Sequence, residues 1–137
     1  MVLVDTSVWV NHFRTSDKHL EKLLLNGEVV CHTHIIGELA CGNIRNRKTI
    51  ISLLRSLPMA SPIEFEEFLY FIEQNQLNGK GIGFVDVHLL ASAQLSQISL
   101  WTEDQRLMKT ATELDLKYKK DSTVHPNAEL SLRSLSH

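Results

Sequence analysis

Four acidic residues stand at positions where carboxylates can do chemistry. Each lies beside an apolar stretch, near a point where a predicted strand ends or a predicted helix begins: Asp5, Glu38, Asp86 and Asp104. Carboxylates that converge repel one another unless a cation lies between them. Mg²⁺, or alternatively Mn²⁺, prefers such oxygen ligands, and two ions about 4 Å apart can promote hydrolysis of a phosphodiester. Together the four acids predict a divalent-metal site.

Each acid taken alone also has a simpler structural explanation. Asp104 and Asp17 can be helix N-caps, which contribute about 1 kcal/mol each, and for Asp17 we expect that role. Asp5 can be a turn residue, and Glu38 can be a solvated helix residue. Asp86 is harder to explain in this way, because a carboxylate inside an apolar segment needs a partner. The prediction therefore depends on the four acids as a set.

Hydroxyl side chains near these acids are candidates for a supporting role. Thr6, Ser7 and Thr102 can donate hydrogen bonds that hold the carboxylates in place, as outer groups of metal sites do, and they can also cap helices. Glu103 is expected to point away from the site, because side chains alternate along the preceding strand. Ser7 has no base and orienting acid arranged with it in the sequence, so a hydrolase triad is poorly supported.

The seven histidines show no spacing typical of metal ligands. We expect them to be structural or exposed, with His88, close to Asp86, as the one functional candidate. Cys31 and Cys41 lie within predicted elements, and we interpret both as buried free thiols rather than as a disulfide or a metal site. Chemistry in this chain is therefore expected from the acids.

Short apolar runs alternate with amphipathic helices along the chain, which predicts an α/β fold with a mostly parallel sheet of four or five short strands. Strands are expected at 2–4, 28–32 and 98–102, with shorter extended pieces at 59–61 and 116–118. Helices are expected at 6–14, 17–25, 33–42, 48–57, 63–76, 84–95 and 104–114. Because parallel strands carry ligand sites at their carboxyl ends, the four acids can meet at one edge.

Composition limits the class of protein. A chain of 137 residues suits one domain, and 43% hydrophobic and 22% charged residues are typical of a soluble protein. We see neither a membrane span nor a signal peptide and expect a cytoplasmic location. A net charge of −2 argues against nonspecific phosphate binding. Two cationic clusters, expected to be solvated, lie at Arg45, Arg47 and Lys48 and at Lys117, Lys119 and Lys120.

Three stretches of the chain resemble the motifs of PIN-domain proteins. They are VLVDTSVW at 2–9, GFVDVHLLASA at 83–93 and LWTEDQRL at 100–107. Glu38, within IGELACG at 36–42, matches the middle acidic position of the family. The length and the single domain are similar to those of VapC toxins from type II (VapBC) toxin–antitoxin pairs. The resemblance covers roughly residues 1 to 118.

This resemblance implies a three-layer α/β/α nuclease domain, which we place at 1–120. From Asp121 onward the chain is rich in Ser and Thr, which predicts a C-terminal tail at 121–137 that is longer than the family pattern needs. The resemblance also implies a Mg²⁺-dependent endoribonuclease acting on structured RNA such as tRNA or rRNA. The implied metal site is Asp5, Glu38, Asp86 and Asp104, supported by Thr6 or Ser7 and by Thr102. A homodimer is implied, with a small antitoxin that blocks the site, often through a basic side chain, and that provides the contact with DNA.

Other functions remain open at this point. A metal nuclease acting on DNA or on flap structures would use the same chemistry, although the chain is short for the extra elements that thread a strand. A phosphatase with Asp5 as nucleophile is less well supported, because Ser7 occupies the place of a second Asp. A noncatalytic scaffold or binding module can keep the fold, although the four intact acids argue against it.

Overall fold

The structure, a computed structural model, describes residues 1–120, and the predicted tail at 121–137 lies outside the described residues. Its centre is a three-stranded parallel sheet in the order β2-β1-β3. The strands are β1 (Val2–Val4), β2 (Val29–Val30) and β3 (Ser99–Trp101). The mostly parallel α/β architecture is confirmed.

The predicted count of four or five strands differs slightly from the three that form. The expected outer strands are present as single bridges, Cys31 with Met59 beyond β2 and Leu100 with Lys117 beyond β3. Each outer segment exchanges only two backbone hydrogen bonds with the sheet, for example Cys31 N–H to Pro58 O at 2.8 Å and Ala60 N–H to Cys31 O at 2.8 Å. Pairing at a single residue is too short to make a strand.

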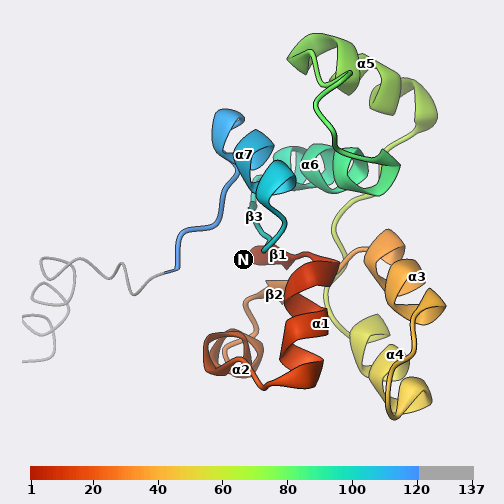
Figure 1. Ribbon diagram of the computed structural model, residues 1–137, viewed down its shortest axis with the longest axis vertical. Helices are drawn as coiled ribbons and strands as arrows, with labels where there is room; N and C mark the ends of the chain where they lie inside the picture. The colour runs from red at the N-terminus through yellow and green to blue at the C-terminus, as the bar shows by residue number, and fades with distance from the viewer. Residues whose placement is uncertain (121–137) are drawn as a thin grey trace, which may run out of the picture.

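Seven helices surround this sheet within residues 1–120. They are α1 (Thr6–Arg14), α2 (Lys18–Leu25), α3 (Thr33–Cys41), α4 (Arg47–Arg55), α5 (Phe65–Asn75), α6 (Phe84–Ser96) and α7 (Gln105–Glu113). Helices α1 to α4 gather at the β2 end of the molecule and α5 to α7 at the β3 end (Figure 1). None of these helices is long and apolar enough to cross a membrane.

Helix boundaries follow the predicted ranges to within about two residues, and the shifts have local causes. Asp17 lies just outside α2 and caps it, accepting the Leu20 N–H at 3.0 Å, as expected. Helix α5 begins at Phe65 rather than at residue 63, because Glu64 is its N-cap and donates its N–H to Glu67 Oε1 at 2.9 Å. An N-cap residue has extended backbone and does not belong to the helix.

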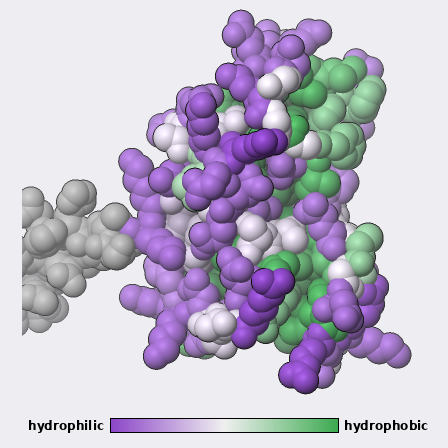
Figure 2. Space-filling model, viewed as in Figure 1, coloured by the Kyte–Doolittle hydropathy of each residue, from purple (hydrophilic) through white to green (hydrophobic). Residues whose placement is uncertain are grey.

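The core is built on β1 and α6. All three residues of β1, the central strand of the sheet, are buried. Residues 87–93 of α6 are buried without interruption, and the small side chains of Ala91, Ser92 and Ala93 let the helix pack closely on its neighbours. Figure 2 shows hydrophobic surface at the α5 end, where Phe65 and Leu69 are exposed, and again in the lower half of the molecule.

The two cysteines are free and differ in burial. Cys31 is buried, as predicted, whereas the prediction is wrong for Cys41, which is exposed. Cys41 follows the buried Leu39 by two residues, which turns its side chain about 200° around α3, away from the core.

A buried histidine joins two helices. His32 is 2% exposed, and its Nδ1 accepts the His34 N–H at 3.0 Å at the start of α3. The ring proton therefore lies on Nε2, which donates to Ser92 Oγ of α6 at 3.1 Å. The pKa of His32 is lowered to about 4, mainly by burial and additionally by the nearby His34 and His88. His32 is thus a neutral structural group.

This histidine predicts a pH dependence of stability. The unfolded chain binds the proton near the ordinary pKa of 6.5, whereas folded His32 binds it only near 4. Folding stability should fall as pH drops through that window, by roughly 2–3 kcal/mol from His32 alone. His32→Asn keeps an acceptor for the His34 N–H. This variant should be less stable than wild type at pH 7, and its folding stability should fall less steeply as pH drops.

Urea unfolding of both proteins between pH 7 and 4 checks this. Other titrating groups are common to the two proteins, so the difference between their curves isolates His32. If the free energies of unfolding of the two proteins fall in parallel with pH, the neutral buried His32 is not the cause of the pH dependence.

Candidate active site

The best-positioned carboxylate is Asp5, which follows the central strand β1 directly. It is 5% exposed, and its N–H donates to Trp101 O of β3 at 2.9 Å. Two hydroxyls donate to the same carboxylate oxygen: Ser7 Oγ to Oδ2 at 2.8 Å and Thr102 Oγ1 to Oδ2 at 2.7 Å. These bonds fix the Asp5 side chain through Oδ2, and Oδ1 takes part in neither of them. The expected contacts of Ser7 and Thr102 are therefore present.

The two hydroxyls are themselves oriented by the backbone. Glu103 N–H donates to Ser7 Oγ at 2.9 Å, and Asp104 N–H donates to Thr102 Oγ1 at 3.0 Å. Each hydroxyl thus accepts a backbone proton and gives its own proton to Asp5. The Glu103 side chain is exposed, so this residue contributes through its amide. The network joins the start of α1 to the turn between β3 and α7.

The carboxylates of the other three acids each accept one hydrogen bond. Glu38 on α3 accepts from Thr6 Oγ1 at 2.7 Å, so Thr6 contacts Glu38 and not Asp5. Asp86, on the first turn of α6, accepts the Gly83 N–H at 3.2 Å. Asp104 caps α7 by accepting the Leu107 N–H at 2.9 Å, the structural role that its position allowed. Each of these bonds uses one carboxylate oxygen.

Electrostatics connects all four acids. The pKa of Asp86 is raised, first by burial and then by the negative charges of Asp5, Asp104 and Glu38, while the bond from Gly83 opposes the rise. Coulomb repulsion falls with distance, so the three acids that act on Asp86 are near enough for their charges to be felt there. The charges of the other three predicted acids therefore reach Asp86.

The donor set suits a hard divalent cation. Four carboxylates that repel one another gain most from an ion with oxygen ligands, and Asp5 is already oriented by its hydroxyls. As arranged, no group of three or more His, Cys, Asp or Glu side chains within residues 1–120 is close enough to hold a metal. Coordination by three of the acids would thus require rotation of side chains such as Glu38 and Asp86, away from their present hydrogen bonds.

A cluster of rings beside the acids was not expected from the sequence. His88 lies 4.5 Å from Phe68, 4.6 Å from Phe84 and 4.7 Å from His34, measured between ring centroids. Burial lowers the pKa of His88, and the charge of the nearby His34 contributes to the lowering by a smaller amount. These ring contacts give His88 a structural role. The available sequence signal was spacing: His34 precedes Glu38 by one helical turn, and Phe84, which is 57% exposed, precedes His88 by one turn.

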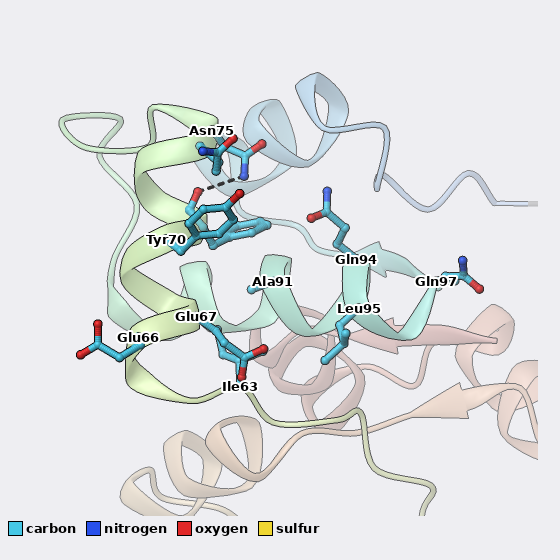
Figure 3. A pocket seen from close by; sticks show the side chains of 11 residues that line it. Ile63, Glu66, Glu67, Tyr70, Asn75, Ala91, Gln94, Leu95 and Gln97 are labelled. Atoms are coloured by element: carbon cyan, nitrogen blue, oxygen red, sulfur yellow. Dashed lines mark hydrogen bonds between the residues drawn. The ribbon is translucent and has the colours of Figure 1, made fainter.

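A groove of about 600 Å³ lies between α5 and α6, away from the acids. Figure 3 shows Tyr70 and Glu67 of α5 facing Gln94 and Leu95 of α6 across it. These α6 residues belong to its second half, whereas Asp86 is on its first turn. The groove and the four candidate acids therefore lie in different parts of the molecule, and we place the candidate site at the acids.

Comparison with protein families agrees with these features. The model of the PIN domain family matches residues 2–113. Among curated proteins, Ribonuclease VapC32 of Mycobacterium tuberculosis, from strain CDC 1551 / Oshkosh and from strain ATCC 25618 / H37Rv, is 40% identical over 114 residues. The match covers 82% of this chain and 92% of the relative.

Two solved structures share the fold at low sequence identity. PAE2754 from Pyrobaculum aerophilum aligns with a TM-score of 0.55 and 18% identity, over 80% of this chain and 78% of that one. A chain from the structure of FitAB bound to an IR36 DNA fragment aligns with a TM-score of 0.53 and 14% identity, over 82% of this chain and 91% of that one.

The hydroxyl network predicts a measurable cost for its removal. Thr102→Val keeps the shape of the side chain, removes one donor to Asp5 and leaves the Asp104 N–H without its acceptor. We expect a loss of about 1–3 kcal/mol in the free energy of unfolding, measured in urea with chelator present. Thr112→Val is the control, since Thr112 is exposed and bonds only to Met108 O of its own helix. Equal losses in the two variants would contradict the assigned role.

Charge repulsion predicts the opposite effect for Asp86. Asp86→Asn keeps an acceptor for the Gly83 N–H and removes the partly buried charge. It should unfold at higher urea than wild type at pH 7 in chelator, and the gap should close as pH falls through the raised pKa, where wild-type Asp86 becomes neutral. Asp17→Asn, a helix cap, should change little. A destabilised Asp86→Asn protein would show that the Asp86 charge is not held at a net electrostatic cost.

Proposed function

The chain belongs to the PIN-domain family, and on that basis we propose that it is the toxin of a type II (VapBC-like) toxin–antitoxin system, a metal-dependent endoribonuclease. The proposal is supported by the charges of Asp5, Glu38 and Asp104 acting on Asp86, and by Ser7 and Thr102 holding the Asp5 carboxylate. The ribonuclease name of the relative at 40% identity supports RNA as the substrate class.

In this proposal Asp5, Glu38, Asp86 and Asp104 hold Mg²⁺ or Mn²⁺. A bound divalent ion supplies an activated water and stabilises charge on the phosphate oxygens. The chain's own contribution is orientation, since Ser7 and Thr102 restrain Asp5 through Oδ2 and leave Oδ1 free of those bonds. Thr6 does the same for Glu38 through one carboxylate oxygen.

The proposed substrates are structured RNAs such as tRNA or rRNA, as the family resemblance implies. The proposed partners are a second copy of the chain and a small antitoxin. A basic side chain of the antitoxin placed among the four acids would relieve the repulsion that otherwise favours a metal ion. DNA would be contacted only through that antitoxin, and the FitAB structure with its DNA fragment is an example of a related fold bound to DNA in a complex.

One observation favours a second candidate, a noncatalytic binding module. The acids as arranged form no group close enough to hold a metal within residues 1–120, so the site would have to close on an ion. A nuclease that acts on DNA would use the same acids, and substrate choice distinguishes it.

Cleavage assays test the proposal. Purified chain free of any partner should cut bulk tRNA or rRNA with Mg²⁺ and stop when chelator is added. Asp5→Asn and Asp86→Asn should each lower the rate by roughly 100-fold or more, because the remaining acids hold an ion poorly. Asp17→Asn is the matched control: it removes one carboxylate charge at a helix cap and should cut at the wild-type rate.

Three results would overturn parts of the proposal. Full cleavage by Asp5→Asn or Asp86→Asn would remove these residues from the site. Cleavage of DNA in preference to RNA would change the substrate class. Absence of cleavage, combined with partner binding that persists when all four acids are neutralised, would establish the noncatalytic module.

A further inference from the structure

One segment of this acidic chain is strongly basic. Between Glu38 and Glu64 there is no acidic residue, and the cations in that interval are Arg45, Arg47, Lys48 and Arg55. The whole chain has a net charge of −2, so the imbalance is local. The interval includes the end of α3 and all of α4, so its charges are carried next to the helix that bears Glu38.

Three of these cations line one groove. Arg47, Lys48 and Arg55 of α4 surround a groove of about 410 Å³ together with Ile51, Ser52 and Ala40 of α3. All three cations are exposed, and within residues 1–120 none of them forms an ion pair with a carboxylate; the salt bridge that does form there joins Lys80 to Glu113. Their positive charge is therefore available to a ligand.

The three cations differ in their local bonds. Arg47 donates through Nη1 to Ala40 O and to Gly42 O, so it also closes the C-terminal end of α3. Lys48 and Arg55 have no comparable link to α3. Arg47 is thus partly structural, while Lys48 and Arg55 can be changed without removing a cap.

Small side chains cover the exposed side of α3 between Glu38 and the groove. Ala40 lies two residues beyond Glu38, about 3 Å along the axis of α3 and about 200° around it, so the groove and Glu38 lie on different sides of the helix. Gly37 and Cys41 form the exposed side of the helix next to Glu38, and a Cβ added at Gly37 would meet nothing within 4 Å. A strand bound at Glu38 can therefore continue toward the groove without crossing a large side chain.

We propose that this basic groove binds the phosphate backbone of the RNA on one side of the cleavage point. The inference rests on the proposed nuclease function and extends it to the binding of substrate. Four carboxylates repel a polyanion, so a protein of negative net charge needs cations nearby to hold the strand. Arginine and lysine next to open backbone suit phosphate oxygens, arginine as a fork and lysine as a point charge.

Binding can be measured apart from cleavage. In an Asp5→Asn background with chelator, the anisotropy of fluorescein-labelled bulk tRNA reports Kd at several salt concentrations. Lys48→Gln/Arg55→Gln should weaken binding roughly tenfold at low salt and make the slope of log K against log[salt] shallower by about 1–2. Circular dichroism and urea unfolding should show an unchanged fold.

The matched control removes the same charge elsewhere. Lys18→Gln/Lys22→Gln changes two exposed cations of α2, which lies on the other side of α1 from α4 in Figure 1. Its Kd for tRNA should stay within about twofold of the parent protein, because long-range charge effects are screened at moderate salt. In the active background, the groove variant should raise KM and leave kcat close to wild type.

Two outcomes would overturn the inference. The first is a groove variant whose Kd and salt slope equal those of the α2 control. The second is a groove variant that keeps tRNA binding and loses binding of a polyglutamate peptide, which would assign the groove to an acidic protein partner. Neither depends on catalysis, so inactive wild-type protein would contradict the proposed function while this binding test still decides the groove.

Discussion

The structure of the acidic edge depends on two hydroxyls that converge on one oxygen of Asp5. Ser7 comes from the start of α1 and Thr102 from the end of β3, and both donate to Oδ2 while accepting backbone protons from the β3–α7 turn. This arrangement requires β1 and β3 to be parallel neighbours, since only then do their carboxyl ends lie together. The network therefore couples the sheet register to the orientation of the central carboxylate.

Around this fixed carboxylate the molecule accumulates unfavourable negative charge. Asp86 is the acid most affected, because it is partly buried and feels the other three. Such repulsion reduces the stability of a metal-free protein and increases its gain from any cation that enters. A metal ion, a basic side chain of a partner and the cations of a nearby groove are three ways to balance it. The proposed chemistry, inhibition and substrate binding share this electrostatic origin.

The ring cluster adds a different constraint at the same edge. His32, bonded to Ser92, attaches the start of α3 to α6, and His88 packs between Phe68 and Phe84. These contacts position α3, which carries Glu38, relative to α6, which carries Asp86. Neutral histidines suit this place, because burial disfavours their charged form. Packing among apolar and neutral rings thus sets the distance between acids that repel.

Local patterns in the chain are enough to predict the parallel α/β fold and the helices, and they single out four acids as a site that stays a prediction. They include an apolar run before Asp5, helical spacing, and N-caps such as Asp17. Contacts between distant segments decide the remaining features, and these could not be predicted. Packing assigns Thr6 to Glu38 rather than to Asp5, exposes Cys41, and reduces the outer strands to bridges of one residue each. Hydrogen-bond partners 32 or 97 residues apart leave no periodic trace in the chain, so only the folded arrangement selects them.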